Sequence, residues 1–247
     1  MNIIIPMSGR GKRFNDAGYQ FPKPLLPIFG KPMIQFVVEN LDIDARYIFI
    51  CRKDHYEKFS LKNILKSISP GCEIILTDGI TDGAASSVLL AENLINNDEE
   101  LIIANSDQWV DWMSSHFLKF MKRKNADGGM LTFLSTSDKW SYVKLNDDGS
   151  ITEVAEKKPI SNIATVGVYY FKHGLDFVNS ATKMIRKNIR VNNEFYVAPV
   201  YNEMIDEGKK IYPYHVAEMH GLGTPEDLND FLESDIGLSL KNNSTGK

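Results

Sequence analysis

Positively charged residues close to the N-terminus are spaced so that they could bind a small anion. Arg10, Lys12 and Arg13 are interleaved with Gly9 and Gly11 directly after a short apolar run. Glycine lacks a Cβ atom, so phosphate oxygens can approach its backbone N–H closely, and arginine can bind phosphate through two hydrogen bonds. A phosphate site is therefore one interpretation of this loop, and a tight turn with solvated charges is an equally good one.

The spacing of these glycines differs from two familiar phosphate-binding motifs. A P-loop requires the pattern GxxxxGK[ST], which is absent here. A dinucleotide-binding fingerprint would place its third glycine at Phe14. The loop is therefore not a P-loop, and a dinucleotide-dependent oxidoreductase is disfavoured.

A second candidate for function is Lys23, which lies between Pro22 and Pro24 in the stretch PKPL. Proline fixes its own φ angle and restricts the residue before it, so the backbone at Lys23 is held stiffly. A lysine that is merely solvated at the surface does not need a rigid backbone, whereas a functional side chain benefits from one. We therefore expect Lys23 to be functional.

The composition favours a globular protein that binds a small anionic molecule. Its 247 residues, 43% of them hydrophobic, suffice for one large domain or two closely joined ones. The formal net charge of −4 argues against a general nucleic-acid binder. By contrast, residues 1–31 hold five basic residues and a single acidic one.

Several features predict a cytoplasmic protein without a membrane span. No apolar run approaches the ~20 residues that a transmembrane helix needs. The first residues lack the basic region and the cleavage site of a secretion signal. Cys51 and Cys72 each lie in an apolar stretch, which is typical of small core residues in a reduced protein rather than of a disulfide.

The first half of the chain alternates apolar strands with helical segments, which predicts a parallel sheet buried on both faces. The expected strands are 2–5, 47–51, 73–76 and 101–104, and the expected helices are 33–41, 54–68 and 84–95. Right-handed crossovers place the C-terminal ends of such strands at one edge, where open α/β sheets bind ligands. The expected fold class is therefore α/β, with a Rossmann-like, mostly parallel sheet flanked by helices.

The second half has a different pattern and predicts an antiparallel extension of the sheet. The expected strands are 128–136, 142–146, 151–156 and 164–171, with a hairpin turn at 147–150. They are followed by expected helices at 174–187 and 196–207 and a strand at 210–216. Thr224 would be the N-cap of a final helix.

The stretch SGRGKRF…FPKPLLPIFGKPMI resembles the signature GGxGTRL…PKPLxPVxxKPM of the sugar-phosphate nucleotidyltransferases, also called NDP-sugar pyrophosphorylases. These enzymes join an NTP to a phosphorylated acceptor and release pyrophosphate. The resemblance implies the nucleotide-diphospho-sugar transferase type of fold, in a single domain over 1–240. The nucleotide-binding half would be 1–125 and the acceptor-binding half 126–240. We expect the polar tail 241–247 to be disordered.

The same resemblance implies that residues near the N-terminus bind the NTP. It implies that Gly9 and Gly11 cradle the phosphates, and that Arg13 and Lys23 neutralise the charge that moves to the leaving pyrophosphate. The other implied nucleotide contacts are Met7, Ser8, Asp78, Gly83 and Ala84. The Asp78 carboxylate could accept a hydrogen bond from an amino group of cytosine or guanine. An ordinary loop before a helix explains that segment equally well.

Asp107, which follows the expected strand 101–104, is the candidate metal ligand. A lone carboxylate after a strand is commonly only a turn former. However, Mg²⁺ on a triphosphate needs just one or two protein carboxylates, and the family has a metal-binding aspartate at the matching position. The resemblance therefore implies Mg²⁺ as the cofactor, bound by Asp107.

The second half carries the residues that the resemblance assigns to the acceptor. In the segment EVAEKKP, Glu156 would face sugar hydroxyls and Lys157 the acceptor phosphate, and a plain charged strand edge is the alternative. Gly167 would let the acceptor approach the backbone. Ser141 and Glu194 complete this set.

Two departures from the family pattern leave the acceptor open. Gly221 stands where relatives carry a second metal-binding aspartate, so either a neighbour such as Glu218 or water completes the metal shell, or activity is altered. Trp140 and Ser141 replace a Tyr-Gly pair that contacts the sugar in several relatives.

The predicted function is the transfer of a nucleotidyl group to a phosphorylated small molecule. We expect this acceptor to be a sugar 1-phosphate, used for surface polysaccharide or related glycan precursors. The alternatives are a cytidylyltransferase for a phosphorylated alcohol or amine, and a non-catalytic nucleotide-binding regulator. A glycosyltransferase would share the architecture, but the PKPL stretch disfavours it. No nucleic-acid partner is expected, and the nucleobase and oligomeric state stay open.

Overall fold

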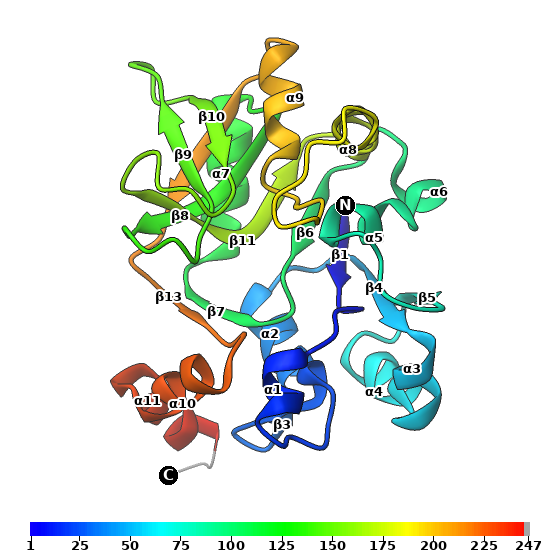
Figure 1. The fold of residues 1–247 in the computed structure, drawn as a ribbon. Coiled ribbons are helices and arrows are strands. Elements are labelled where there is room, and N and C mark those ends of the chain that lie inside the picture. Colours follow the sequence, from blue (N-terminus) through cyan, green and yellow to red (C-terminus); the bar gives the residue numbers. More distant parts are fainter. Residues whose placement is uncertain (245–247) are drawn as a thin grey trace.

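A nine-stranded mixed sheet forms the centre of the computed structural model, which describes residues 1–244. Its main path has the order β10-β9-β11-β6-β1-β4-β5, and β8 connects β11 to β12 beside this path. The parallel strands of the first half are β1 (Asn2–Pro6), β4 (Arg46–Arg52), β5 (Glu73–Thr77) and β6 (Leu101–Ala104). The predicted Rossmann-like sheet is therefore confirmed (Figure 1).

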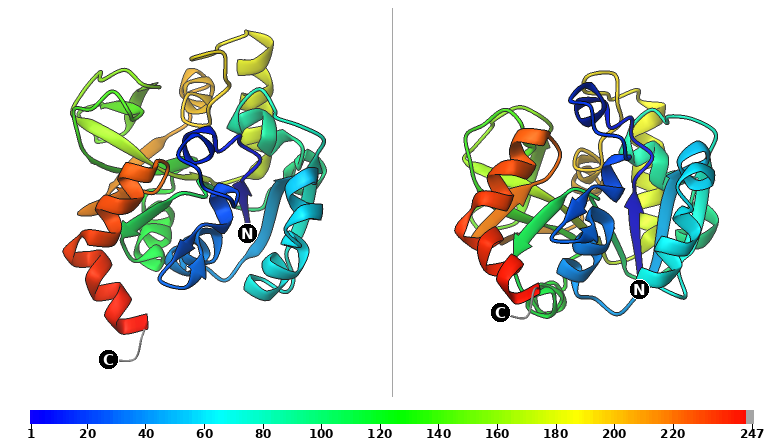
Figure 2. Two further views of the ribbon diagram at one scale, coloured as in Figure 1. Left: turned by 60° about the horizontal axis from the view of Figure 1, so that its bottom comes forward. Right: turned by 90° about the horizontal axis from the view of Figure 1, so that it is seen from below.

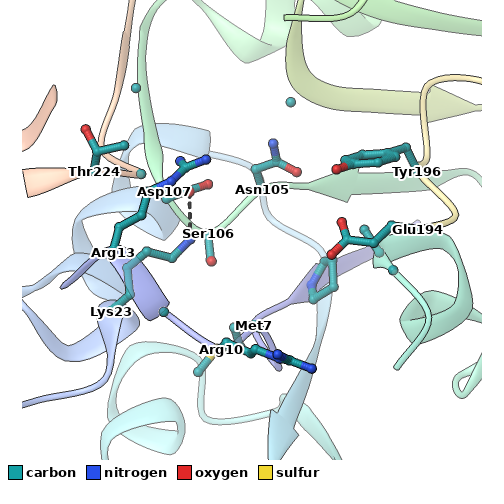
Figure 3. A pocket seen from close by; sticks show the side chains of 18 of the residues that line it. Met7, Arg10, Arg13, Lys23, Asn105, Ser106, Asp107, Glu194, Tyr196 and Thr224 are labelled. Carbon is teal, nitrogen blue, oxygen red and sulfur yellow. Dashed lines mark hydrogen bonds and ion pairs between the residues drawn. The ribbon is translucent and has the colours of Figure 1, made fainter. Parts of the chain in front are cut away.

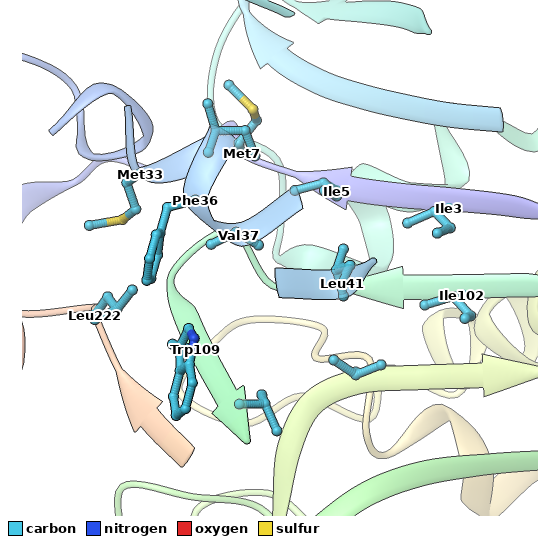
Figure 4. Close-up of a cluster of buried hydrophobic side chains, with 14 of the residues drawn as sticks. Ile3, Ile5, Met7, Met33, Phe36, Val37, Leu41, Ile102, Trp109 and Leu222 are labelled. Carbon is cyan, nitrogen blue, oxygen red and sulfur yellow. The ribbon is translucent and has the colours of Figure 1, made fainter. Parts of the chain in front are cut away.

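Buried aliphatic side chains explain why these segments form central strands. Ile3, Ile4 and Ile5 are fully buried. Because successive side chains of a strand point to opposite faces, Ile3 and Ile5 join one apolar cluster and Ile4 joins the other. Ile102 and Ile103 divide in the same way. Apolar side chains thus cover both faces of the sheet, and Figure 4 shows the cluster that contains Ile3 and Ile5.

The second half adds the antiparallel extension that its pattern predicts. Its strands are β8 (Gly128–Leu134), β9 (Tyr142–Leu145), β10 (Ile151–Ala155), β11 (Ile163–Phe171) and β12 (Ile211–His215). β11 runs antiparallel to β6, with Tyr169 opposite Ile103, so both halves of the chain share one sheet. β12 pairs in parallel with β8 at the far side of the extension.

Most helices lie where the sequence predicts them. They are α2 (Met33–Leu41), α3 (Lys53–Lys58), α4 (Leu61–Ile68), α5 (Ala84–Leu89), α6 (Glu92–Ile95), α8 (Gly174–Arg186), α9 (Val200–Asp206) and α10 (Pro225–Glu233). The single helix expected over 54–68 is wrong, because Ser60 has a left-handed φ of 52° and separates α3 from α4. The single helix expected over 84–95 is wrong as well, because a turn at Leu90 and Ala91 separates α5 from α6. Thr224 caps α10 as expected, since its hydroxyl accepts the N–H of Asp227 at 3.0 Å.

The structure also contains elements that the sequence analysis did not anticipate. They are α1 (Lys12–Asp16), a 3₁₀ turn η1 (Lys23–Leu25), β2 (Pro27–Ile28), β3 (Lys31–Pro32), β7 (Gln108–Asp111), α7 (Ser114–Lys124), β13 (Glu218–Gly221) and α11 (Asp235–Ser244). Because α11 includes 241–244, the disorder expected for 241–247 is wrong in that part. Residues 245–247 lie outside the described part of the chain.

The C-terminal segment returns to the front of the molecule. β13 pairs antiparallel with β7, which places Gly221 opposite Gln108. On α10, Phe231 packs against Phe29 and Phe36, with ring centres 6.1 and 5.7 Å apart. The last helices therefore lie beside the N-terminal segment, as Figure 2 shows from two sides. This return brings the front loop, the residues after β6 and the C-terminal segment to one edge of the sheet.

Two further expectations concern the chain as a whole. Among residues 1–244, the structure has no helix that is long and apolar enough to cross a membrane. Cys51 and Cys72 are buried free thiols, as expected for small core residues.

Candidate active site

A large cavity opens at the edge of the sheet where β1 and β6 end. Its volume is about 1720 Å³. It is lined by His55 and by residues that the topology brings together from 6–17, 22–24, 80–87, 105–108, 138–141, 156–197 and 219–227. All of the predicted site residues line this cavity except Asp78. Residues far apart in the sequence thus share one space, and Figure 3 shows part of its lining.

Asp78 is exposed and lies outside this cavity. The chain turns directly after β5, where the hydroxyl of Thr77 donates to the carbonyl oxygen of Gly79 at 2.6 Å. Thr81 and Asp82, which follow this turn, do line the cavity. The position of Asp78 therefore gives no support to the contact with the nucleobase that was expected for it.

The glycines of the front loop allow a sharp turn between β1 and α1. Gly11 has a left-handed φ of 59°, and its carbonyl oxygen accepts the N–H groups of Phe14 and Asn15 at 3.1 Å. Phe14, where a dinucleotide fingerprint would need glycine, is buried and packs edge-on against Tyr19. This packing holds α1, and with it Arg13, at the wall of the cavity.

Ser8 is a buried part of the same loop and links it to helix α5. Its hydroxyl lies 3.2 Å from the hydroxyl of Ser87 on α5, which in turn lies 2.5 Å from the hydroxyl of Thr81. Sequence analysis did not anticipate Thr81 or Ser87. The three hydroxyl groups join the front loop to the segment that contains Gly83 and Ala84.

The central polar contact of the cavity joins Lys23 to Asp107. Lys23 is the first residue of η1, and Pro22 before it is extended, with φ −61° and ψ 147°. The Lys23 Nζ lies 2.6 Å from Asp107 Oδ2, and both side chains are about one quarter exposed, at 24% and 23%. The side chain of Arg13 extends to the same part of the cavity (Figure 3). The ammonium of Lys23, the guanidinium of Arg13 and the carboxylate of Asp107 thus lie in the same part of the cavity.

The C-terminal segment closes the cavity beside Asp107. The backbone N–H of Leu222 donates to the Asp107 carbonyl oxygen at 2.8 Å. A Cβ atom added to Gly223 would lie 2.8 Å from Asp107 Oδ2, so a side chain there would collide with the carboxylate. Glycine at this position leaves the carboxylate free to face the cavity.

The structure does not favour Glu218 as a replacement for the aspartate that relatives carry at the position of Gly221. Glu218 does not line the cavity, and its carboxylate contacts His220 at 2.7 Å. Asp227 does line the cavity, and its Oδ2 lies 3.9 Å from the place where a Cβ of residue 221 would be. The Lys139 ammonium lies 3.3 Å from the other oxygen of Asp227.

The donor atoms of the cavity fit a magnesium ion that a triphosphate would share. The described residues contain no group of three or more His, Cys, Asp or Glu side chains that could hold a metal without a substrate. A triphosphate supplies oxygen ligands of its own, so one or two protein carboxylates suffice for Mg²⁺. Asp107, with the space that Gly223 leaves beside it, provides such a carboxylate.

Glu156 and Lys157, which the sequence analysis assigned to the acceptor, both line the cavity. Burial raises the pKa of the Glu156 carboxyl, and the hydroxyl of Ser141, which donates a hydrogen bond to it, partly opposes this effect. Lys157 has a left-handed φ of 52° and donates from Nζ to the hydroxyl of Tyr196 at 2.7 Å. Tyr196 lines the cavity and was not anticipated from the sequence.

The structure gives a reason for glycine at position 167 that differs from the one expected from the sequence. The side chain of Gln108 binds both the N–H and the carbonyl oxygen of Gly167, at 3.0 and 2.9 Å. A Cβ atom at this position would lie 2.1 Å from the side-chain nitrogen of Asn105. Packing against Asn105 and Gln108 therefore explains the glycine without any approach of the acceptor to its backbone.

Known proteins have sequences similar to that of this chain. A sequence model of the family described as nucleotidyl transferase matches residues 2–234. A curated relative, the bifunctional protein GlmU of Methanocaldococcus jannaschii, is 26% identical over 248 residues, which cover 98% of this chain and 56% of that protein. The chain thus spans little more than half the length of this relative.

Solved structures with the same fold were found as well. The nucleoside-diphosphate-sugar pyrophosphorylase from Vibrio cholerae RC9 superposes with a TM-score of 0.79 at 25% identity, over 94% of this chain and 100% of that one. The inositol-1-phosphate CTP transferase from T. maritima superposes with a TM-score of 0.76 at 14% identity, over 99% and 96% of the two chains. The second similarity concerns the fold alone.

Proposed function

The chain belongs to the nucleotidyl transferase family, and we propose that it transfers a nucleotidyl group from an NTP to a phosphorylated small molecule, with release of pyrophosphate. The preferred acceptor in this proposal is a sugar 1-phosphate. Within one domain, residues 1–125 bind the NTP and residues 126–240 the acceptor. The observation that carries the proposal is the meeting of Arg13, Lys23 and Asp107 in one cavity.

The size of the cavity supports a reaction between two substrates. Its volume of about 1720 Å³ exceeds the ~300–1,000 Å³ of ordinary small-molecule sites. The nucleotide side carries Arg13 and Lys23, and the acceptor side carries Glu156, Lys157 and Tyr196. An NTP and a phosphorylated acceptor can therefore lie in one continuous space.

The proposed reaction requires little covalent chemistry from the protein. An anionic phosphate oxygen of the acceptor forms a bond to the α-phosphorus of the NTP, and the bond from that phosphorus to the pyrophosphate oxygen breaks. The acceptor oxygen is already deprotonated near neutral pH, so no general base is needed. Arg13 and Lys23 hold positive charge where negative charge accumulates, and such preorganised charge is a major source of catalysis.

Asp107 is the residue that would hold the magnesium ion in this proposal. A magnesium ion bound there would neutralise charge on the phosphate oxygens and orient them. The contact of Lys23 with Asp107 places the ammonium next to that position. The two side chains therefore act on the same triphosphate.

A matrix of substrates tests the proposed function. Wild-type protein is incubated with Mg²⁺, with CTP, UTP, ATP, GTP or dTTP, and with glucose 1-phosphate, N-acetylglucosamine 1-phosphate, inositol 1-phosphate or phosphocholine, and pyrophosphate release is measured. We expect release with one NTP and with a sugar 1-phosphate. Preferential release with phosphocholine or inositol 1-phosphate would replace the sugar by a non-sugar acceptor. Tight NTP binding without release for any pair would contradict an enzymatic function and favour a nucleotide-binding regulator.

A further inference from the structure

Tyr196 connects the two sides of the cavity. Its hydroxyl accepts a hydrogen bond from Lys157 Nζ at 2.7 Å, and the ammonium lies 4.8 Å from the centre of the tyrosine ring. Burial, and after it the carboxylate of Glu194, raise the pKa of Tyr196, so the phenol stays protonated near neutral pH. The charge of Arg13 acts on the same hydroxyl in the opposite direction. Tyr196 therefore lies within electrostatic range of residues from both halves of the chain.

The backbone conformation of Lys157 is one that needs support from neighbouring residues. Its φ of 52° lies in the left-handed region, which non-glycine residues rarely adopt. Such a conformation persists only where neighbouring contacts determine it. The hydrogen bond to Tyr196 fixes the other end of this residue, a side chain that otherwise has four flexible carbons.

Contacts with the nucleotide side in turn fix the backbone next to Tyr196. The N–H of Phe195 donates to the carbonyl oxygen of Asp82 at 2.7 Å, and the Phe195 carbonyl oxygen accepts the N–H of Ala85 at 3.0 Å. Arg190 lies 4.0 Å above the Phe195 ring and forms an ion pair with Asp82 at 3.1 Å. Gly83 is required here, because an added Cβ atom would lie 2.5 Å from the Phe195 carbonyl oxygen.

We infer that Tyr196 is a positioning residue, which holds the Lys157 ammonium in place for the acceptor phosphate and is itself set by the contact of Phe195 with residues 82–85. One hydrogen of the ammonium binds the tyrosine and two are left for phosphate oxygens. An ammonium fixed in advance loses less conformational entropy when the acceptor binds. This inference rests on the proposed function, since it takes the acceptor to be a phosphorylated molecule.

The kinetic test uses Tyr196→Phe, which removes the hydroxyl and keeps the ring. With the NTP and acceptor that react fastest in the substrate matrix, we expect the KM for the acceptor to rise about tenfold, as for the loss of a hydrogen bond to a charged group. The KM for the NTP should not change. Tyr170→Phe is the matched control, because the Tyr170 hydroxyl donates to Glu100 at 2.8 Å but does not line the cavity. An equal rise of both KM values in Tyr196→Phe would overturn the inference.

A second measurement needs no substrate. Lysines are acetylated with an N-hydroxysuccinimide ester, and the modification rate of each is measured by mass spectrometry. In Tyr196→Phe we expect Lys157 to react several-fold faster, while Lys139, an exposed lysine of the same cavity, reacts as in wild type. An unchanged rate at Lys157 overturns the positioning role, whatever the activity. Faster modification with an unchanged acceptor KM overturns the link to the acceptor.

The two measurements separate failure of this inference from failure of the proposed function. If wild-type protein releases no pyrophosphate with any pair, the proposed function fails, and the acetylation rate still decides whether Tyr196 positions Lys157. Arg190→Ala tests the contact of Phe195 with residues 82–85. Arg190 contacts both the Phe195 ring and the Asp82 carboxylate, and it does not line the cavity. We expect faster acetylation of Lys157 in this variant as well. The same rate as in wild type would contradict the role of that contact.

Discussion

The Lys23 ammonium and the Asp107 carboxylate are 2.6 Å apart, although 84 positions separate them in the sequence. The contact joins a turn between two prolines to the loop that follows β6. A partly exposed ion pair contributes only about 0–1 kcal/mol to stability, so its significance lies in its geometry. It places a fixed positive charge beside a carboxylate oxygen, which is the arrangement that the proposed metal-bound triphosphate needs.

Replacing Asp107 by asparagine should weaken the binding of a divalent metal together with an NTP. The change removes the negative charge and keeps the size of the side chain. We expect the affinity for Mn²⁺, measured by electron paramagnetic resonance with an NTP present, to fall by at least about tenfold. Removing a residue that only hydrogen-bonds to a metal ligand already lowers metal affinity by about this factor. Asp111→Asn is the control, because Asp111 is exposed on β7 and does not line the cavity. Equal Mn²⁺ affinity in both variants would exclude Asp107 as a ligand.

Gly223→Ala should impair activity more than folding. The new methyl group would lie 2.8 Å from Asp107 Oδ2, and the carboxylate can avoid it only by moving away from its present position. A side chain can move at low cost, so the melting temperature should change little. Because Asp107 is the proposed metal ligand, displacing its carboxylate should lower kcat/KM by about tenfold or more. Gly71→Ala, where a Cβ meets no atom within 4 Å, is the control. Wild-type kcat/KM in Gly223→Ala would show that the position of this carboxylate does not matter.

Glu156→Gln should stabilise the protein at neutral and alkaline pH. Burial raises the pKa of Glu156 above the ordinary value of 4.5. The stability that this carboxyl contributes is therefore complete below its pKa in the unfolded chain, and it is lost as the pH rises through the raised pKa of the folded state. Glutamine cannot ionise and avoids this loss. The free energy of unfolding of Glu156→Gln should exceed that of wild type at about pH 8, and the difference should shrink toward about pH 4.

Urea denaturation across this pH range checks the prediction. Glu153→Gln provides the comparison, because Glu153 lies on β10, which ends directly before Glu156, is exposed and pairs with Lys144 at 2.7 Å. A difference between Glu156→Gln and wild type that is independent of pH would mean that the carboxyl does not ionise as described.

The sheet was predictable because its strands are apolar along their whole length. Ile3, Ile4 and Ile5 can be accommodated only where both faces of a strand are covered. Helix α7 was not recognised, because basic and polar residues dominate it and its buried face is narrow, with Phe117 and Met121 as the apolar residues fully buried on it. Periodicity gives too little signal for such a segment.

The site could be predicted where local sequence defines the backbone. The prolines beside Lys23 and the position of Asp107 after a buried strand are features of this kind. Tyr196 has no local signal, because its contact with Lys157 depends on how two distant segments cross. The packing that requires glycine at position 167 has no local signal either, since Asn105 and Gln108 come from another part of the chain.

Pyrophosphate release by Lys23→Met, compared with Lys31→Met, tests the central claim most directly. Both lysines belong to the same motif, but Lys31 is exposed, pairs with Glu39 and does not line the cavity. We predict that Lys23→Met lowers kcat by ~10²–10³, the effect of removing one preorganised group, and that Lys31→Met keeps wild-type kcat. Wild-type release by Lys23→Met would contradict the claim that this ammonium, Arg13 and Asp107 act on one triphosphate.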